Sequence, residues 1–189
     1  MRLPIAPLLA AGLSASAAGA HAAPPPPLPN VPVAEVDLAR YAGTWYEQAH
    51  LPMFFQRKCV ADTTAHYSLN ADGTVAVVNR CRKADGSFNE AHGVARVVGG
   101  RTSTLEVRFA PRWLSWLPLV WGDYWVIALD ETDYHWAMVG APDADYLWIL
   151  SRTPRLDPEV RAGLVEQARA MGYPVDRLIG TPHSGDAGD

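Results

Sequence analysis

Apolar and polar residues alternate along most of the chain between residues 44 and 152, and short groups of Gly, Asp and Pro interrupt the alternation. A period of two is typical of a β-strand that buries one face, and such interruptions are typical of turns between antiparallel strands. The pattern therefore predicts eight consecutive strands, at residues 44–50, 61–70, 74–82, 87–98, 103–110, 120–130, 133–141 and 145–152.

One helix is predicted after the last strand. Asp157, Pro158 and Glu159 form a typical helix start, with an N-cap side chain, a proline at the first position and an acidic first turn. Gly172 ends the helix, and before it apolar residues recur at helical spacing, at Val160, Leu164, Ala168 and Met171. Eight meandering strands can close without leaving an edge, so we expect an all-β, eight-stranded antiparallel up-and-down barrel with this α-helix packed outside.

The first and last predicted strands carry a pair of residues that supports closure of the sheet. Gly43 lies two residues before Trp45 at the start of the first strand, and Arg152 ends the last strand. A guanidinium group can stack on the face of an indole ring. Contact between Trp45 and Arg152 would therefore join the first strand to the last.

These motifs resemble the signature of the lipocalins, whose first strand carries Gly-x-Trp and whose last strand carries the arginine. The hairpin at residues 67–75, the segment at residues 128–134 and the helix after Pro154 follow in the order and spacing of that family. The resemblance covers the chain from Asp37 to about residue 179. Within the lipocalins, the chain is most similar to the group of the bacterial outer-membrane lipocalins, apolipoprotein D and the plant temperature-induced lipocalins.

The resemblance implies a closed barrel floor and a ligand pocket above it. The floor would consist of Gly43, Trp45 and Arg152. Pocket-lining residues are expected at Tyr67, Asn79 and Trp148. A few polar groups in an apolar cavity suit an amphiphile such as a fatty acid or a lysophospholipid.

Alternation in the fifth predicted strand adds two residues to the expected pocket. Val107 and Phe109 share the inward face with Leu105, whereas Glu106 and Arg108 should point outward. An eight-stranded barrel can hold one small ligand or be filled by its own side chains, so both alternatives stay open.

Length and composition describe one globular domain and exclude one class of partner. The chain has 189 residues, 49% of them hydrophobic, and a net charge of −4. It therefore offers no basic surface for nucleic acid. Seven Trp residues must line a core or cavity, or lie at a lipid–water boundary.

The N-terminal part of the chain predicts export. A positive Arg2, an Ala- and Leu-rich run and a small-x-small site ending at Ala22 are typical of a secretory signal peptide at residues 1–22. The alternative is a transmembrane anchor, which would need an uninterrupted apolar run. A Pro-rich linker is predicted at residues 23–36, the lipocalin domain at 37–181 and a disordered tail at 182–189.

The leader contains no Cys that could carry a lipid at the cleavage site, unlike many bacterial relatives. We therefore expect an exported protein, periplasmic or associated with the outer membrane, without a lipoprotein anchor. Cys59 and Cys81 favour a disulfide in such a compartment, which would add roughly 3 kcal/mol to stability in the chain-entropy model. The alternative is a free thiol that acts as a nucleophile inside the barrel.

Two apolar loops are expected at one mouth of the barrel. The first, at residues 51–55, contains Phe54 and Phe55, and the second, at residues 113–119, contains Trp113 and Trp116. Exposed apolar residues next to arginines suit the surface of an anionic membrane. The alternatives are a hydrophobic lid over the entrance or a contact between two copies in a homodimer.

Catalytic and metal-binding patterns are not found in the sequence. It contains no Gly-x-Ser-x-Gly or His-Glu-x-x-His motif, and its six histidines show no metal-ligand spacing with the cysteines. Asp130 and Asp133 could form a carboxylate pair, but a capping role at a closed-end turn is favoured. We expect a protein that is not an enzyme and that holds no metal and no cofactor.

These features predict a carrier that binds fatty acids or lysophospholipids, for lipid transport, storage or membrane maintenance under stress in the cell envelope. One alternative is an enzyme with a lipocalin fold that acts on a lipid-like substrate, with Cys59 or an inward carboxylate doing the chemistry. Another is a lipocalin that binds a tetrapyrrole.

Overall fold

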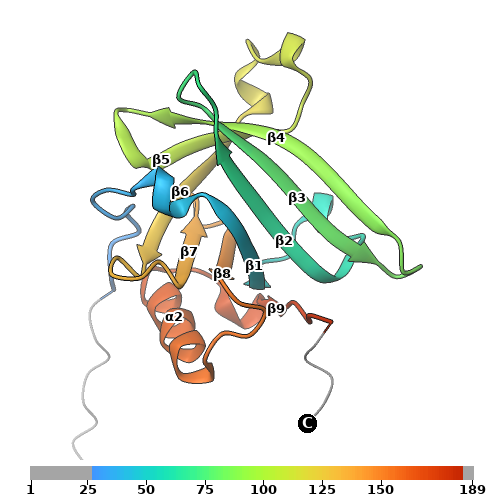
Figure 1. The fold of residues 1–189 in the computed structure, drawn as a ribbon. Coiled ribbons are helices and arrows are strands. Elements are labelled where there is room, and N and C mark those ends of the chain that lie inside the picture. Colours follow the sequence, from blue (N-terminus) through green and yellow to red (C-terminus); the bar gives the residue numbers. More distant parts are fainter. Residues whose placement is uncertain (1–26, 185–189) are drawn as a thin grey trace, which may run out of the picture.

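The computed structural model describes residues 27–184, which form a barrel of antiparallel strands with one helix against its outside (Figure 1). The predicted signal peptide lies outside the described residues, as do residues 23–26 of the predicted linker and residues 185–189 of the predicted tail.

Eight strands follow one another around the barrel. They are β1 (Gly43–His50), β2 (Cys59–Leu69), β3 (Val75–Lys83), β4 (Phe88–Val98), β5 (Arg101–Arg108), β6 (Gly122–Leu129), β7 (Trp136–Gly140) and β8 (Leu147–Ser151). Each strand pairs antiparallel with the next, and β8 returns to pair with β1. The eight-stranded up-and-down barrel predicted from the alternation is therefore confirmed.

The predicted helix is α2 (Pro158–Ala170), and it lies outside the barrel (Figure 1). The carboxylate of Asp157 caps it by accepting hydrogen bonds from the backbone N–H groups of Glu159 and Val160. Leu164 and Ala168 are buried against the outer face of β6, β7 and β8. The helix start, the apolar stripe and the outside position expected from the sequence are all present.

The floor motif lies at the closed end of the barrel. The guanidinium carbon of Arg152 stands 3.9 Å from the centroid of the Trp45 ring, and its nitrogens donate to the backbone oxygens of Arg40 and Thr44. Gly43 has a φ of 98°, and a Cβ at this position would lie 3.4 Å from the Arg152 side chain. Both the backbone conformation and the close approach therefore favour glycine.

The segment that precedes the barrel also packs against it. The short helix α1 (Leu38–Tyr41) crosses the closed end, and Val36 just before it is 1% exposed. Farther upstream, the backbone N–H of Val33 donates to Val126, and that of Leu28 donates to Ala170. The second half of the predicted linker is therefore part of the packed domain.

Two hydrophobic clusters hold the fold together. One fills the inside of the barrel around Tyr41, Trp45 and Leu105, and the other lies between the outer wall and α2 around Met138 and Ile149. The inner cluster decides how much of the barrel is left for a ligand.

Candidate functional site

A chain of three hydrogen-bonded tyrosines lies inside the barrel. The hydroxyl oxygen of Tyr124 lies 2.9 Å from those of Tyr41 and Tyr67. Burial raises the pKa of all three phenols, that of Tyr67 to about 12, so these hydroxyls stay neutral at physiological pH. We call the interior on the Trp45 side of this chain the closed half, and the interior on the Trp148 side the open half.

The tyrosine chain keeps one unused hydrogen. Each hydroxyl holds one hydrogen and can accept as well as donate. The two bonds at Tyr124 use two of the three hydrogens, so one hydroxyl of the chain can still donate to another acceptor. If that hydroxyl is Tyr67, the chain offers a neutral donor toward the open half.

The inner wall of the open half is largely apolar and only part-buried. Val107 and Trp148 pack part-buried against the inner cluster, and Asn79 lies between Ala65 and Ala91 in the register of the sheet. The side-chain oxygen of Asn79 is buried and has no hydrogen-bond partner among the described residues. Small neighbours and an unpartnered acceptor suit a site that binds an amphiphile.

The end of β5 differs in part from the alternation pattern. Phe109 lies just beyond the strand, is 42% exposed and covers Gly93, where a Cβ would lie 2.8 Å from its ring. Arg108 is on the outer face but is only 8% exposed, although a solvated charge was expected there. The centroid of the Trp121 ring lies 5.2 Å from the guanidinium carbon of Arg108. The guanidinium of Arg108 also donates to the carbonyl oxygen of Ala110.

The five residues predicted to contact a ligand share the inner face of the sheet. Tyr67 belongs to the tyrosine chain. The other four line the open half: Asn79, Val107, Phe109 and Trp148. Direct contact between these residues and a ligand stays a prediction.

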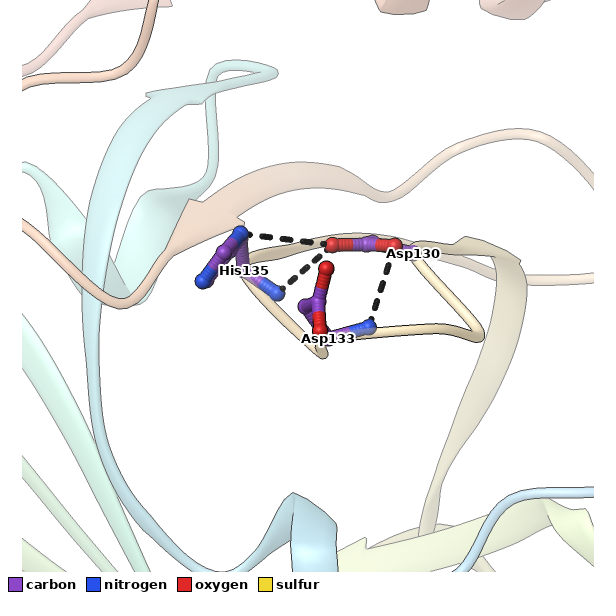
Figure 2. Close-up of side chains that lie close together, drawn as sticks. All are labelled: Asp130, Asp133 and His135. Carbon is purple, nitrogen blue, oxygen red and sulfur yellow. Dashed lines mark hydrogen bonds and ion pairs between the residues drawn. The ribbon is translucent and has the colours of Figure 1, made fainter.

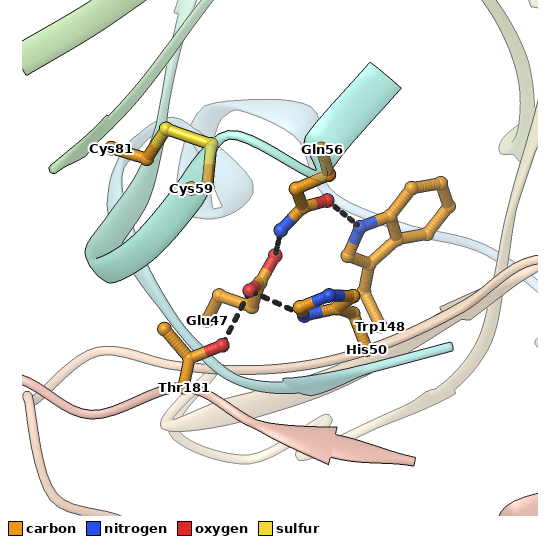
Figure 3. Close-up of a disulfide and its surroundings, with 7 residues drawn as sticks. All are labelled: Glu47, His50, Gln56, Cys59, Cys81, Trp148 and Thr181. Carbon is orange, nitrogen blue, oxygen red and sulfur yellow. Dashed lines mark hydrogen bonds and ion pairs between the residues drawn. A yellow bond between two sulfur atoms is a disulfide. The ribbon is translucent and has the colours of Figure 1, made fainter. Parts of the chain in front are cut away.

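A buried carboxylate lies beside this inner wall (Figure 3). Glu47 of β1 is 3% exposed, and it accepts hydrogen bonds from Gln56 Nε2 at 2.6 Å and from Thr181 Oγ1 at 2.5 Å. His50 Nδ1 lies 2.8 Å from the same carboxylate in an ion-pair contact. The indole N–H of Trp148 donates to Gln56 Oε1 over 3.4 Å, which is a long hydrogen bond.

The sequence analysis did not identify Glu47 or its partners as a cluster. Alternation places Glu47 on the same face as Trp45, so an acidic residue at an inward position was the available signal. Its partners come from irregular segments, because Gln56 belongs to a 3₁₀ turn and Thr181 follows the last short strand. Periodicity does not predict where such segments pack.

The C-terminal strap, which we define as residues 179–184, completes the barrel wall between β1 and β2. β1 pairs with β2 at residues 43–46 and with β9 (Ile179–Gly180) at residues 49 and 50. On the other side, Asp62 of β2 donates its backbone N–H to Pro182 and accepts hydrogen bonds from Ser184. The ordered wall therefore extends three residues into the stretch predicted as a disordered tail.

Cys59 and Cys81 form a disulfide near the same wall (Figure 3). Their Cα atoms lie 5.4 Å apart, and the bond joins the start of β2 to β3. The predicted disulfide is confirmed, and the alternative of a free thiol nucleophile is wrong. A disulfide of this kind persists in oxidising compartments, as expected of an exported protein.

Each of the two apolar loops connects an odd-numbered strand to the next, so both leave the same end of the barrel, but they pack against different parts of it. In the first loop, Phe54 and Phe55 are 74% and 55% exposed, and Phe55 stacks on Tyr146, which stacks on Trp148. This aromatic row borders the open half. Whether it contacts a membrane stays a prediction.

The second loop, at residues 109–121, folds over the outer face of β4 and β5. Trp121 lies 3.9 Å from the guanidinium of Arg96, and together with Trp116 and Glu106 these residues line a surface pocket of about 260 Å³. Trp113 and Trp116 are nevertheless 73% and 75% exposed. They form an apolar surface on the side of the barrel.

Asp130, Asp133 and His135 lie close together at the turn between β6 and β7 (Figure 2). Asp130 uses both carboxylate oxygens to accept hydrogen bonds from the backbone N–H groups of Asp133 and His135. Burial would raise the pKa of Asp130, but these hydrogen bonds and the nearby His135 lower it below the ordinary value. The arrangement therefore supports the capping role expected for Asp130.

Among the described residues, no helix is both long and apolar enough to cross a membrane. The family model of a lipocalin-like domain matches residues 36–183. Temperature-induced lipocalin-1 of Arabidopsis thaliana is 40% identical over 151 residues, which cover 79% of this chain and 80% of that protein.

Two further relatives show the same likeness. Outer membrane lipoprotein Blc of Escherichia coli K12 is 38% identical over 175 residues, which cover 92% of this chain and 94% of Blc. Apolipoprotein D of Mus musculus is 31% identical over 163 residues, which cover 81% of this chain and 80% of that protein.

Solved structures show the same fold at lower identity. Insecticyanin from the tobacco hornworm Manduca sexta has a TM-score of 0.63 and 23% identity, and the likeness covers 86% of this chain and 89% of insecticyanin. Apocrustacyanin C2 has a TM-score of 0.61 and 16% identity, with 79% of this chain and 81% of the other covered.

Proposed function

The chain belongs to the lipocalin family, and we propose that it is a carrier that binds a fatty acid or a lysophospholipid in the open half of the barrel. It would serve lipid transport, storage or membrane maintenance under stress in the cell envelope. The observation that carries the proposal is the inner wall of the open half, which is apolar and part-buried and in which the Asn79 oxygen has no partner within residues 27–184.

The chemistry of that wall suits a single acyl chain. Val107, Phe109 and Trp148 provide apolar surface, and each buried methylene group of a ligand would contribute about 0.8 kcal/mol. The oxygen of Asn79 would accept a hydrogen bond from a ligand hydroxyl or amide, and the spare hydrogen of the tyrosine chain would meet a carbonyl oxygen. An apolar cavity with a few oriented polar groups is the usual form of a site for such molecules.

The proposed location is the periplasm or the outer membrane. The disulfide and the predicted signal peptide support export, and one group of relatives is named outer membrane lipoprotein.

Membrane contact would come from the exposed apolar loops. Trp113 and Trp116 beside Arg112 suit the interface of an anionic bilayer. Sedimentation with anionic liposomes tests this idea, with a Trp113→Ser, Trp116→Ser double variant expected to lose binding. Unchanged binding by the double variant would contradict it, and a dimer of the wild-type protein that the double variant loses would instead assign the loop to a homodimer contact.

The enzyme alternative is less well supported than the carrier. The thiol chemistry considered for it needs a free cysteine, and both cysteines are bonded to each other. The inward carboxylate of Glu47, the other type of group considered for it, already accepts hydrogen bonds from Gln56 and Thr181. On these grounds we propose a protein that is not an enzyme. A haem absorbance titration tests the remaining tetrapyrrole alternative, and saturable binding at one site per chain would favour it.

The direct test of the carrier is native mass spectrometry of protein purified from its own envelope fraction, followed by organic extraction and lipid analysis. One bound fatty acid or lysophospholipid per chain is the expected result. An empty barrel whose Trp fluorescence does not change with added lipid would contradict the proposal.

A further inference from the structure

We propose that Glu47 is a positioning residue of the ligand site, which couples the C-terminal strap to Trp148 through Gln56. The inference rests on the proposed function, because it concerns how the same open half holds its ligand. Three parts of the chain meet at this carboxylate, namely β1, the 3₁₀ turn Phe54–Gln56 and the strap, and Trp148 of β8 joins them through Gln56 (Figure 3).

We call the hydrogen bonds from Thr181 through Glu47 and Gln56 to Trp148 the relay. The types of donor and acceptor fix the orientation of its side chains. A carboxylate only accepts hydrogen bonds, an indole N–H only donates, and an amide side chain does both. Gln56 must therefore turn Nε2 toward Glu47 and Oε1 toward Trp148, as it does in the structure. The opposite orientation of the amide would break both contacts.

Burial makes each bond of the relay matter. Glu47 and Gln56 are 3% and 9% exposed, so water cannot readily replace a lost partner. Thr181 and His50 share one oxygen of the carboxylate, and Gln56 holds the other. Without the hydroxyl of Thr181, His50 is the remaining described contact of Glu47 Oε1. The carboxylate then reorients, and the amide of Gln56 turns with the carboxylate.

The relay ends in the aromatic row at the mouth. Trp148 lies stacked on Tyr146, and Tyr146 lies against Phe55, so a change at the Trp148 indole reaches the first loop. The other end is the strap, which Ser184 also fastens to Asp62 on the outer side. The strap therefore holds both the barrel wall and the mouth in place. Loss of its contacts with Glu47 and Asp62 makes both more mobile.

The first test uses the ligand-free protein. A Thr181→Val variant keeps the shape of the side chain and removes only its bond to Glu47. The ¹⁵N-labelled indole resonance of Trp148, assigned with a Trp148→Phe variant, should shift, while that of Trp121 on the outer wall should not. An unmoved Trp148 resonance would overturn the proposal.

A matched control removes the same kind of bond elsewhere on β1. Thr44→Val deletes a hydroxyl whose partner is His66 on the outer face, so it should leave the Trp148 resonance in place. Thr181→Ser keeps a hydroxyl at the strap and should restore the wild-type resonance. A shift of equal size in Thr44→Val would also count against the relay.

The second test measures release of dansylundecanoic acid by stopped-flow displacement. Thr181→Val should release this probe about two- to tenfold faster, the range expected for the loss of one net hydrogen bond. A purely structural role would lower Tm in Thr181→Val and leave both the resonance and the release rate unchanged, which would contradict the proposal. Failure of the wild-type protein to bind any lipid would refute the proposed function, and the resonance test would still decide the relay.

Discussion

The closed and open halves of the barrel interior are built differently. In the closed half, Trp45 is fully buried, its indole N–H donates to the backbone oxygen of Tyr41, and Arg152 covers its ring. In the open half, small or part-buried side chains line the wall, and the buried oxygen of Asn79 lacks a partner among the described residues.

This difference suggests that the closed half contributes mainly to the stability of the fold and the open half mainly to ligand binding. Large side chains that satisfy one another fill the closed half and stabilise the closed sheet. In the proposed carrier, the less buried wall of the open half leaves polar groups that a ligand would satisfy, and these groups would cost stability until the ligand binds. The tyrosine chain marks the boundary, because its hydroxyls bond to one another and leave one hydrogen unused.

The largest effect is expected from Trp45→Ala. Removal of this fully buried ring should lower the free energy of unfolding by about 3–5 kcal/mol, as for other large aromatic residues in cores. Urea denaturation followed by circular dichroism measures the loss. A decrease below about 1 kcal/mol would show that the closed half is not the main source of stability.

The next largest effect is expected at the tyrosine chain, at alkaline pH. Burial raises the pKa of Tyr67 from 10.0 to about 12, so the folded protein favours the neutral phenol. The stability linked to this shift is fully present below pH 10, and it is lost as the pH rises from 10 through about 12. A shift of two units corresponds to about 2.7 kcal/mol.

Denaturation from below pH 10 up to about pH 12 would measure this loss in the wild-type protein. A Tyr67→Phe variant, which has one phenol fewer, should lose less stability across the same range. Equal losses in the two proteins would argue that the tyrosine chain does not carry the alkaline transition.

Trp148→Ala should change binding more than stability. Trp148 is only part-buried and belongs to the wall of the open half, so its loss should weaken binding of a fatty acid about tenfold, or about 1.4 kcal/mol. Fluorescence titration with a dansylated fatty acid measures this change, and urea denaturation of the same variant should show a smaller loss than Trp45→Ala. Unchanged affinity would place the ligand elsewhere.

The smallest effect concerns the strap at acid pH. Burial would raise the pKa of Asp62, but hydrogen bonds from Ser184 and the charge of Arg82 outweigh it and lower the pKa below the ordinary 3.8. The stability from this carboxylate is therefore present above pH 3.8 and is lost as the pH falls through the lower folded value.

We expect this contribution to stay below about 1 kcal/mol, because Asp62 is part-exposed. The difference in unfolding free energy between wild type and Asp62→Asn should be constant from pH 5 to pH 7 and should shrink below pH 4. A difference that grows on acidification would reverse the assigned sign.

The fold could be predicted from the sequence because its main signals are periodic. Strand alternation, the cap at Asp157 and the spacing of Trp45 and Arg152 are local patterns or family motifs, and each has its counterpart in the structure. The inward face of Asn79 and Trp148 was expected from the resemblance to the lipocalins, and alternation added only which neighbours share that face. These elements needed no knowledge of how distant loops pack.

The polar clusters could not be predicted in the same way. Glu47 meets Thr181 across 134 positions of sequence, and Thr181 lies in a strap without periodicity. Arg108 is shielded from solvent because an irregular loop places Trp121 over it. The alternation of the strands does not predict the conformation of that loop. Contacts of this type depend on tertiary packing, which overrides local patterns.

The most direct test of the account is an NMR titration of the ¹⁵N-labelled protein with a lysophospholipid below its micelle concentration. We predict that the side-chain signals of Trp148 and Asn79 shift and saturate at one ligand per chain, while the indole signal of Trp45 stays in place. Saturable shifts at Trp113, Trp116 or Trp121, with Trp148 and Asn79 unchanged, would place the lipid on the outer wall and contradict the division between the two halves.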